Sequence, residues 1–489
     1  MDNITITAEE KMKNNVINNS LEKAMMSIQA ASSQVNNDPL RPAYHFLPPA
    51  NWMNDPNGTL YHDGWYHLFY QHNPYDEDWG HIHWGHARSR DMLHWEHLPV
   101  ALVPDAAHGE EHCWSGCAVV NGNGDPMIFY TSIGKDHKEF DSAQQCLAFG
   151  DRNLIEWRQE ISQPFLSEQM HNGVKIYDWR DPYIFEHHNE TYMVLGGNLG
   201  GRVGGQGVVA LYKADDRTLR TWQYCGLPYQ CLDVNVKQLD CPNLFKLGDK
   251  WVLLHSPWHG SIRYLVGEMD FNKPRFTACR EGYVDHGPDL FATNTTITLD
   301  GRLIMWAWVR GYNTSRGWKG CMAVPRELSL NKNYELIQKP ISELDGLFDL
   351  SKSIKMSELH GKQRLDNIHG SSYEVRCKFR VKDAKRFGLR LLVSEDGRRG
   401  FDIWHDADGV HVNGTPLYAA RVGEDDLLDM RVLVDRSVIE VFLEDGRTTV
   451  SRVYLPDTGD DRIELYAEQG SVYLDSFCYR SLRNSMKDI

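Results

Sequence analysis

A recurring strand–turn–strand pattern is the feature that most restricts how this 489-residue chain can fold. Five segments each begin with a polar residue and continue as an apolar stretch, a tight turn and a second apolar stretch. They start at Asp55, Ser115, Asp181, Asp240 and Thr293, at intervals of 53 to 66 residues. Repeats of this length, each with further strand signals, are typical of propeller blades of four strands. We therefore predict an all-β fold built on a closed five-bladed β-propeller, because a single blade cannot bury both of its faces.

The sequence on either side of the repeats predicts two further parts. Residues 1–38 carry apolar positions three to five residues apart, and Thr7 and Glu10 have the spacing of a capping box, which predicts a helix that ends before Pro39. Its apolar positions are Met12, Val16, Leu21, Met25, Ile28 and Ala31. After Leu350, alternating strands joined by Gly and Asp turns predict an antiparallel β-sandwich. The predicted division is an N-terminal helical extension (1–38), a catalytic propeller domain (39–348) and a C-terminal sandwich domain (349–489).

Composition excludes several classes of partner. The 67 acidic residues outnumber the 52 basic ones, and the formal charge is −15. Such a balance repels nucleic-acid backbones and anionic lipid surfaces, so we expect neither partner. No stretch is apolar enough for a membrane span, and the N-terminus lacks the pattern of a secretory signal. The ten cysteines include no C-x-x-C pair, which favours reduced thiols and a cytoplasmic location.

Equivalent positions of the repeats carry carboxylates. Residues at the same position in different blades lie at the same height around the central channel, so Asp55, Asp181 and Asp240 are expected to meet there although they are distant in sequence. Carboxylates at close range raise the pKa of one another. This arrangement can supply a protonated acid beside an ionised nucleophile.

The stretch Trp52-Met53-Asn54-Asp55-Pro56-Asn57-Gly58 carries the most specific signal. In isolation Asp-Pro-Asn-Gly is a common turn. Here the whole string resembles the nucleophile motif of glycoside hydrolase family 32, which includes invertases, fructanases and sucrose-6-phosphate hydrolases. Further strings of that family follow in order: FYQ at 69–71, WG at 79–80, WSG at 114–116, RDP at 180–182 and DRSVIEVF at 435–442. The resemblance covers roughly residues 40–489.

The resemblance implies a five-bladed propeller followed by a β-sandwich, and hydrolysis of β-fructofuranosides with retention and without a cofactor. It implies that Asp55 is the nucleophile and that Asp181 stabilises the transition state, with Arg180 holding the substrate or the carboxylates. The remaining substrate-binding positions that it implies are Trp52, Asn54, Gln71, Trp79, Trp114 and Ser115. Buried core positions for the two rings at 79 and 114, and a satisfied interior amide for Gln71, are the structural alternatives.

The chain departs from the family at the fourth blade. The family carries Glu-Cys-Pro where this chain has Asp240-Cys241-Pro242. We assign the acid/base role to Asp240 because its position and its neighbours match, although its carboxyl group is withdrawn by about 1.5 Å, one C–C bond. A misplacement of about 1 Å can cost about 100-fold in rate. Asp233 is a second, weaker candidate for the acid.

Two further clusters have alternative interpretations. The histidines of the stretch 81–86 resemble a metal cluster, but they lack the spacing and the accompanying Cys or carboxylate ligands, and we predict no metal. Arg310, Arg316 and Lys319 form a basic cluster that either binds a substrate phosphate or is solvated surface.

The predicted function is therefore retaining hydrolysis of terminal β-D-fructofuranosides: sucrose, sucrose 6-phosphate or fructo-oligosaccharides. Two alternatives stay open: a fructosyltransferase, and a weakly active or non-catalytic sugar-binding propeller, which the shorter acid at Asp240 would explain. The sequence also leaves open a homo-oligomer formed through the sandwich or the N-terminal helix.

Overall fold

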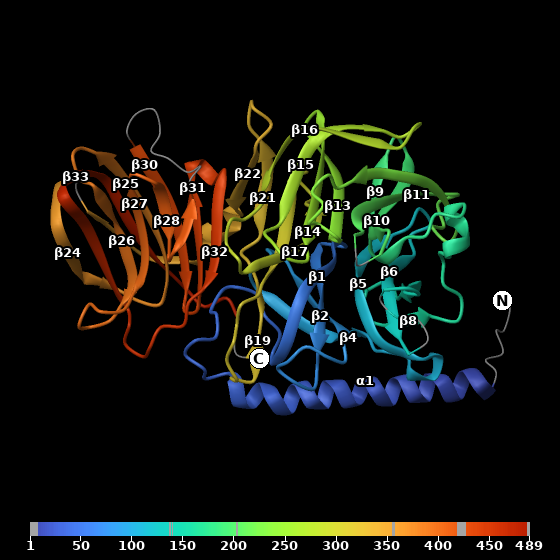
Figure 1. The fold of residues 1–489 in the computed structure, drawn as a ribbon. Helices are drawn as coiled ribbons and strands as arrows, with labels where there is room; N and C mark the ends of the chain where they lie inside the picture. The colour runs from blue at the N-terminus through green and yellow to red at the C-terminus, as the bar shows by residue number, and fades with distance from the viewer. Residues whose placement is uncertain are drawn as a thin grey trace.

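A computed structural model describes residues 8–135, 138, 140–201, 204–354, 357–417 and 427–486, with the side chains of the first helix described from residue 19 onward. Thr7 therefore lies outside the described residues, as do the side chains of Glu10, Met12 and Val16. Two β-rich bodies lie side by side, and the helix α1 (Ala8–Val35) runs beneath the body that comes first in the chain (Figure 1). The described part of the chain contains no helix with both the length and the apolar character needed to cross a membrane.

The first body is the predicted five-bladed propeller. Blade one consists of β1 (Asn51–His62), β2 (Trp65–Asn73), β3 (His83–Ser89) and β4 (Trp95–Leu102), and blade two of β5 (Glu110–Val120), β6 (Pro126–Gly134), β7 (Gln144–Gly150) and β8 (Trp157–Glu160). Blade three consists of β9 (Tyr177–His187), β10 (Glu190–Leu199), β11 (Gln206–Ala214) and β12 (Trp222–Gln230). Blade four consists of β13 (Leu239–Leu247), β14 (Lys250–Pro257), β15 (Arg263–Asp270) and β16 (Arg275–Tyr283). Blade five consists of β17 (Leu290–Ile297), β18 (Leu303–Val309), β21 (Arg326–Leu330) and β22 (Leu336–Pro340), with β20 (Cys321–Met322) beside β18.

The ring closes between the last blade and the first. The innermost strands β1, β5, β9, β13 and β17 contact one another in that order, and β17 contacts β1. In addition, β19 (Trp318–Lys319) leaves blade five and pairs in parallel with the start of β1. Blade one, which carries the predicted nucleophile, is therefore held by hydrogen bonds from both ends of the propeller sequence.

A β-bulge interrupts the innermost strand of each blade at the same place. The register shifts between Met53 and Pro56, between Cys113 and Gly116, between Asp240 and Asn243, and between Phe291 and Thr293, and it also shifts where β9 pairs with β10. A bulge adds a residue to one strand, bends it and redirects its side chains. These bulges aim the polar side chains of the repeats into the channel mouth, whereas a regular strand would alternate them between the faces of its blade.

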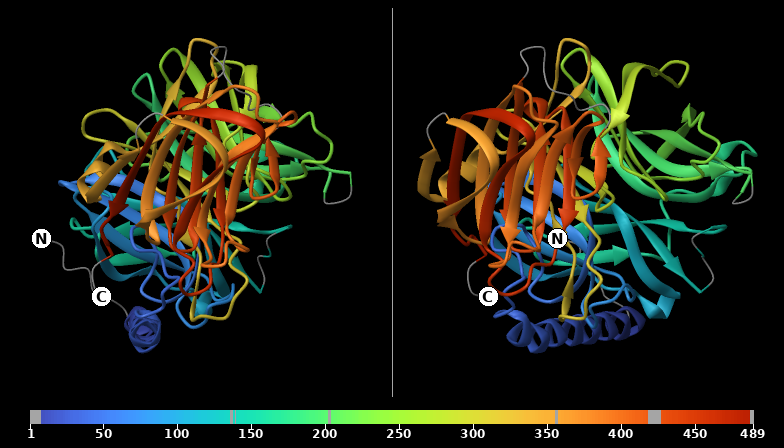
Figure 2. Two further views of the ribbon diagram at one scale, coloured as in Figure 1. Left: turned by 90° about the vertical axis from the view of Figure 1, so that its left-hand side faces the viewer. Right: turned by 60° about the vertical axis from the view of Figure 1, so that its left-hand side comes forward.

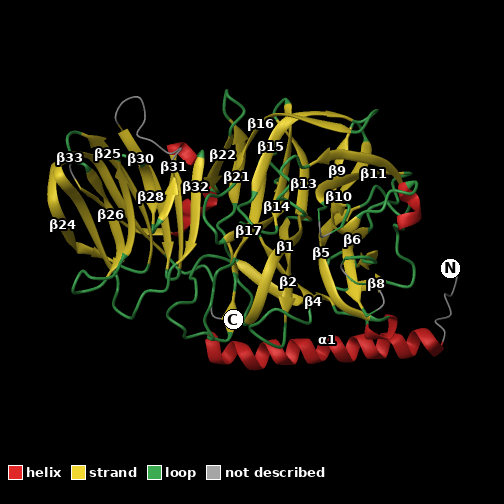
Figure 3. Ribbon diagram, in the orientation of Figure 1, coloured by secondary structure: helices red, strands yellow, loops and turns green. Residues whose placement is uncertain are grey.

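The second body is the predicted β-sandwich, which Figure 2 shows face on in its left view. Its strands are β23 (Phe348–Ile354), β24 (Ser357–His369), β25 (Ser372–Val381), β26 (Arg386–Val393), β27 (Phe401–Asp406), β28 (Gly409–Val412), β29 (Thr415–Leu417), β30 (Leu427–Asp435), β31 (Val438–Leu443), β32 (Thr448–Val453) and β33 (Arg462–Leu482). The first part of β33 pairs with β26 and the second part with β25, so this long strand joins the two layers. Four 3₁₀ helices complete the described elements: η1 (Ala106–His108), η2 (Glu168–His171), η3 (Ser342–Leu347) and η4 (Glu444–Gly446). Figure 3 shows how strongly strands dominate the described chain.

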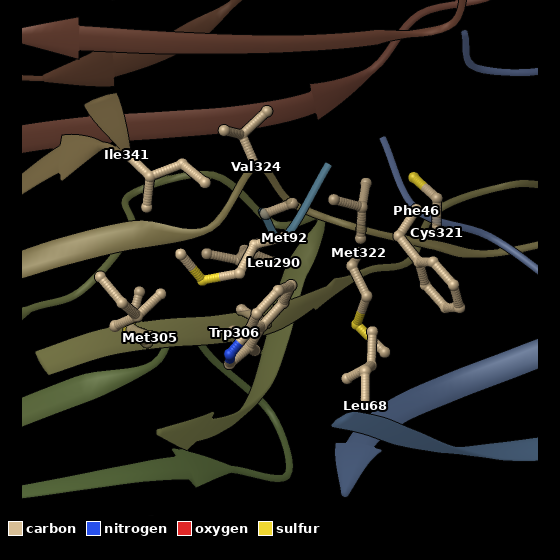
Figure 4. Close-up of a cluster of buried hydrophobic side chains, with 14 of the residues drawn as sticks. Phe46, Leu68, Met92, Leu290, Met305, Trp306, Cys321, Met322, Val324 and Ile341 are labelled. Carbon is tan, nitrogen blue, oxygen red and sulfur yellow. The ribbon is translucent and has the colours of Figure 1, made fainter. Parts of the chain in front are cut away.

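An apolar cluster joins blades one and five to the sandwich. Figure 4 shows Leu68 of blade one and Trp306 of blade five in this cluster, together with Phe46 from the segment before blade one. Val324 and Ile341 lie beneath the sandwich strands. Leu433 and Phe442 of the sandwich belong to the same buried cluster. The two bodies therefore share one hydrophobic core at their contact.

A fully buried charged network lies beside this core. His45 contacts Asp435 through Nδ1 and Glu440 through Nε2, both at 2.9 Å, and Arg326 donates to Glu440 and to Asp285. All five side chains are completely buried. Asp435 and Glu440 belong to the DRSVIEVF stretch, so this signature ties the sandwich to the propeller.

The N-terminal helix agrees with the sequence prediction in type and in its end, because α1 stops at Val35, four residues before Pro39. Ala24 and Ile28 are buried against Val100 and Val103 of the first blade, and Leu21, Met25 and Tyr75 pack around them. The helix α1 is therefore docked along the propeller through these side chains.

Candidate active site

The mouth of the propeller channel holds a pocket of about 330 Å³. All ten residues predicted from the sequence to form the site line it: Trp52, Asn54, Asp55, Gln71, Trp79, Trp114, Ser115, Arg180, Asp181 and Asp240. They come from β1, β2, β5, β9, β13 and the loop after β2, which are far apart along the chain. The convergence of the three carboxylates expected from the repeat is therefore a feature of the structure.

Asp55 is held by a chain of hydrogen bonds across two blades. Ser115 Oγ donates to one carboxylate oxygen at 2.6 Å, and Asn54 Nδ2 donates to the other at 3.0 Å. Gln71 accepts from Asn54 and donates to Ser115, which closes the chain. Trp52 Nε1 in turn fixes the Asn54 oxygen at 2.8 Å. These bonds fix the orientation of the Asp55 carboxylate in the pocket. The Gln71 amide has hydrogen-bond partners on both its oxygen and its nitrogen, and it belongs to this hydrogen-bond chain.

Arg180 lies among the other carboxylates. Its Nη2 donates to Asp240 Oδ1 at 2.8 Å, Nη1 contacts Asp178 Oδ1 at 3.3 Å, and Nε lies 3.9 Å from Asp181 Oδ2. Asp181 Oδ2 accepts from the backbone N–H of Cys241 at 2.9 Å. Arg180 therefore pairs most closely with Asp240, and its sequence neighbour Asp181 is a more distant partner.

Burial raises the pKa of two of these carboxyl groups. The pKa of Asp181 rises to about 7 because the group is desolvated; Arg180 opposes the shift and the charge of Asp240 adds to it. The pKa of Asp240 is also raised by burial, again against the effect of Arg180, with the charge of Asp55 adding to the rise. Carboxyls this close titrate together, so the raised pKa values belong to the pair and not to either side chain alone.

Three aromatic residues of the pocket were not predicted: Trp258, Phe291 and Trp308. Trp308 lies near the end of the second strand of blade five, beside the bulge, much as Gln71 lies near the end of the second strand of blade one, so aligning the repeats could have found it. Trp258 follows the end of β14 and is half exposed, and no repeat position identifies it. Trp79 is also half exposed, so this ring lies at the rim and is not a core residue.

The second candidate for the acid lies outside the pocket, and the basic cluster does not act as one unit. Arg310 packs over the ring of the pocket residue Phe291, with 4.4 Å from its guanidinium carbon to the ring centre. Asp233 is absent from the pocket lining and instead accepts from Arg263 at 3.1 Å. Arg316 pairs with Asp38 at 2.5 Å, and Lys319 pairs with Asp78 at 2.5 Å. Two of the three basic side chains are thus engaged by carboxylates of the chain itself. Within the described residues, no group of three or more His, Cys, Asp or Glu side chains is arranged to hold a metal ion.

The pocket continues into a wider groove. This groove has a volume of about 580 Å³ and shares Trp79 and Trp114 with the pocket. Among its other described lining residues are His112, Lys138 and Phe140. A small, carboxylate-rich pocket that opens beside two tryptophan rings suits one sugar unit at the bottom and a second unit next to it.

Comparison with known proteins identifies the class. Residues 45–340 match the model of the glycosyl hydrolases family 32 N-terminal domain, and residues 343–481 match that of the glycosyl hydrolases family 32 C-terminal domain. The chain therefore belongs to glycoside hydrolase family 32, and it is a glycoside hydrolase that acts on fructosides.

The relatives include several activities. The chain is 30% identical to the sucrose-6-phosphate hydrolase of Escherichia coli over 459 residues, which covers 88% of this chain and 93% of the relative. It is also 30% identical to the levanase of Bacillus subtilis over 515 residues, covering 94% of this chain and 72% of that protein. Among solved structures, the Bombyx mori β-fructofuranosidase in complex with sucrose superposes with a TM-score of 0.81 at 28% identity, covering 96% of this chain and 99% of the other.

Proposed function

We propose that this chain hydrolyses terminal β-D-fructofuranosides with retention of configuration, by double displacement through a fructosyl–Asp55 intermediate. The observation that carries the proposal is the meeting of Asp55, Asp181 and Asp240 in one pocket, with Asp55 oriented by Ser115 and Asn54. Sucrose, sucrose 6-phosphate and fructo-oligosaccharides all carry the terminal fructosyl unit that this pocket would hold.

In the first step, the ionised Asp55 carboxylate attacks the anomeric C2 of the fructosyl unit while Asp240 gives its proton to the glycosidic oxygen. The C2–O bond to the leaving sugar breaks and a C2–O bond to Asp55 forms. Asp181 accepts hydrogen bonds from the ring hydroxyls and so stabilises the transition state. In the second step, Asp240 takes a proton from water and the water oxygen bonds to C2 while the C2–O bond to Asp55 breaks. The Asp55 carboxylate is freed, and fructose leaves with the original configuration.

The short side chain at 240 is compatible with this scheme on two grounds. Asp240 lines the pocket, and it begins the β13 bulge, where the next residue, Cys241, has a left-handed φ of 47°. Burial raises the pKa of Asp240, which favours the protonated form that an acid needs. Its shortness predicts a slower protonation step than a glutamate in that place would give.

One experiment tests the proposal directly. Wild-type protein is mixed with sucrose, and the anomeric configuration of the fructose released is followed by NMR in the first minutes. The proposal predicts β-fructofuranose as the first product. Inversion at C2, or no release of fructose from sucrose, sucrose 6-phosphate, 1-kestose and inulin alike, would contradict it.

Fructosyl transfer is a second candidate, and the groove beside the pocket favours it. An acceptor sugar bound next to Trp79 and Trp114 could replace water in the second step. Oligofructosides would then exceed free fructose at high sucrose concentration, and their absence would leave hydrolysis as the activity.

A further inference from the structure

A second pocket lies on the same face of the propeller, farther from the channel. It has a volume of about 200 Å³ and lies where blade four meets blade three; Tyr229 of β12, His255 of β14, Arg263 of β15 and Tyr283 of β16 line it. The strand pairing fixes its side of the molecule. Asp240 faces Ser256 across β13 and β14, His255 faces Arg263, and Arg263 faces Tyr283. The pocket therefore lies at the same end of blade four as the catalytic carboxyl.

The groups in this pocket suit a sugar. Tyr283 is 45% exposed and presents a ring that can stack on the C–H face of a pyranose or furanose. The Arg263 guanidinium lies 5.9 Å from the centre of that ring, and its Nη2 donates to Asp233 at 3.1 Å, which restricts its orientation. A rigid ring beside an oriented donor fork is the combination that binds hydroxyl-bearing, uncharged ligands.

His255 provides a second, independent indication. Its side chain lines the pocket and is almost fully buried, and its Nδ1 has no hydrogen-bond partner among the described residues. A buried polar atom without a partner is costly, and such atoms normally have one. Burial lowers the pKa of His255 to about 3, so the imidazole is neutral and offers one donor and one acceptor.

The end of β14 connects the two pockets. His255 lies in the outer pocket, and Trp258, three residues later, lines the catalytic pocket and is half exposed. We propose that the outer pocket, defined by Tyr229, His255, Arg263 and Tyr283, binds a sugar unit of a fructo-oligosaccharide whose terminal fructosyl unit occupies the catalytic pocket. This inference rests on the proposed function, and it makes oligosaccharides and polysaccharides, not disaccharides, the substrates that gain from the outer pocket. Two linked contacts raise the apparent affinity over either one alone.

The test measures kcat/KM of one variant on a long substrate, inulin, and on a short one, sucrose. Tyr283→Ala is expected to lower kcat/KM for inulin about 3- to 10-fold, the range expected for losing one aromatic stacking contact, and to leave kcat/KM for sucrose unchanged. Tyr473→Ala is the matched control, because Tyr473 is similarly exposed but lies on the sandwich strand β33. This control should change neither value.

A binding measurement separates the outer pocket from catalysis. In an Asp55→Asn background, calorimetric titration with inulin should show weaker binding when Tyr283→Ala is added, whether or not the wild type turns over. Equal inulin binding with and without Tyr283→Ala, or equal losses on sucrose and inulin, would overturn the inference. A wild type that binds inulin through Tyr283 and hydrolyses no fructoside would instead refute the proposed function.

Discussion

Two clusters of carboxylates in this protein share a similar composition and have opposite properties. In the interdomain network, Asp285, Asp435 and Glu440 surround Arg326 and a histidine whose pKa is raised to about 9. In the active site, Asp55, Asp181 and Asp240 have Arg180 as the one cation among the described residues that line their pocket, and Arg180 also contacts Asp178. The first cluster is completely buried and the second opens into a pocket.

The pKa shifts follow from this difference. Two cations and several backbone N–H donors stabilise the interdomain carboxylates, so the pKa of Glu440 falls to about 2 and that of Asp435 is lowered in spite of burial. In the active site one guanidinium does not offset the burial of Asp181 and Asp240, so both pKa values rise. Where cations and N–H donors fully offset the burial of the carboxylates, the cluster is a structural link between domains. Where they do not, a carboxyl group can keep a proton that is available for chemistry.

The largest effect is expected from the proposed nucleophile, Asp55. Asp55→Asn keeps the size of the side chain but removes its charge and one of its two acceptor oxygens, and it should lower kcat for sucrose by at least about 10⁴-fold. Because the substitution removes one of three crowded charges, the free energy of unfolding in urea should not decrease. Substantial remaining activity, or a loss that merely parallels unfolding, would show that the site and the interdomain network do not differ as described.

The next largest effect is expected on stability, from a change in the interdomain network. Glu440→Gln leaves His45 and Arg326 buried without their shared carboxylate, and it should lower the free energy of unfolding by about 3–5 kcal/mol. The control is Asp445→Asn, which breaks an exposed pair with Lys339 and should cost less than about 1 kcal/mol. Similar small losses in both variants would mean that burial adds nothing to the interdomain pairs.

The network should also make stability depend on pH. His45 has a pKa of about 9 in the folded protein and about 6.5 when unfolded, so its contribution is complete below pH 6.5 and is lost as the pH rises through 9. The shift corresponds to a loss of about 3 kcal/mol between those limits. Urea unfolding of wild type and His45→Gln across this range is the measurement. If the free energy of unfolding declined equally steeply with pH in both proteins, His45 would not be the cause of the pH dependence.

The activity should also depend on pH, and it should change at a lower pH than the stability does. Because Asp181 titrates near 7 and the pKa of Asp240 is raised, the shared proton is lost as the pH rises above about 7. The value of kcat/KM for sucrose should then fall, approaching tenfold per pH unit. A profile that stays flat to pH 9 would show that no group of the site needs to be protonated.

Much of the architecture was predictable from the sequence, because it depends on local patterns. The repeat predicted five blades, alternation after Leu350 predicted the sandwich, and the periodicity of 1–38 predicted a helix that the structure has at Ala8–Val35. The ten pocket residues followed from the motifs, and the structure brings all of them together. What the repeat could not supply was the bulge in each innermost strand, which depends on pairing between strands and aims the side chains inward.

Other features depend on contacts between distant segments. Nothing in the local sequence around Arg316 or Lys319 reveals that Asp38 and Asp78 pair with them. Trp258 follows a strand without a recurring motif, and it reaches the pocket because of the path of the loop after β14. The raised pKa of Asp181 requires knowledge of its burial, since its neighbour Arg180 alone would lower that pKa.

The central claim, that the shortened carboxyl of Asp240 protonates the leaving group, is tested most directly by changing the leaving group. Asp240→Ala and wild type are compared on sucrose and on an aryl β-fructofuranoside whose phenol leaves without protonation. The account predicts a loss of at least about 100-fold in kcat/KM on sucrose and little change on the aryl substrate. Equal losses on both substrates, or an unchanged rate on sucrose, would contradict it.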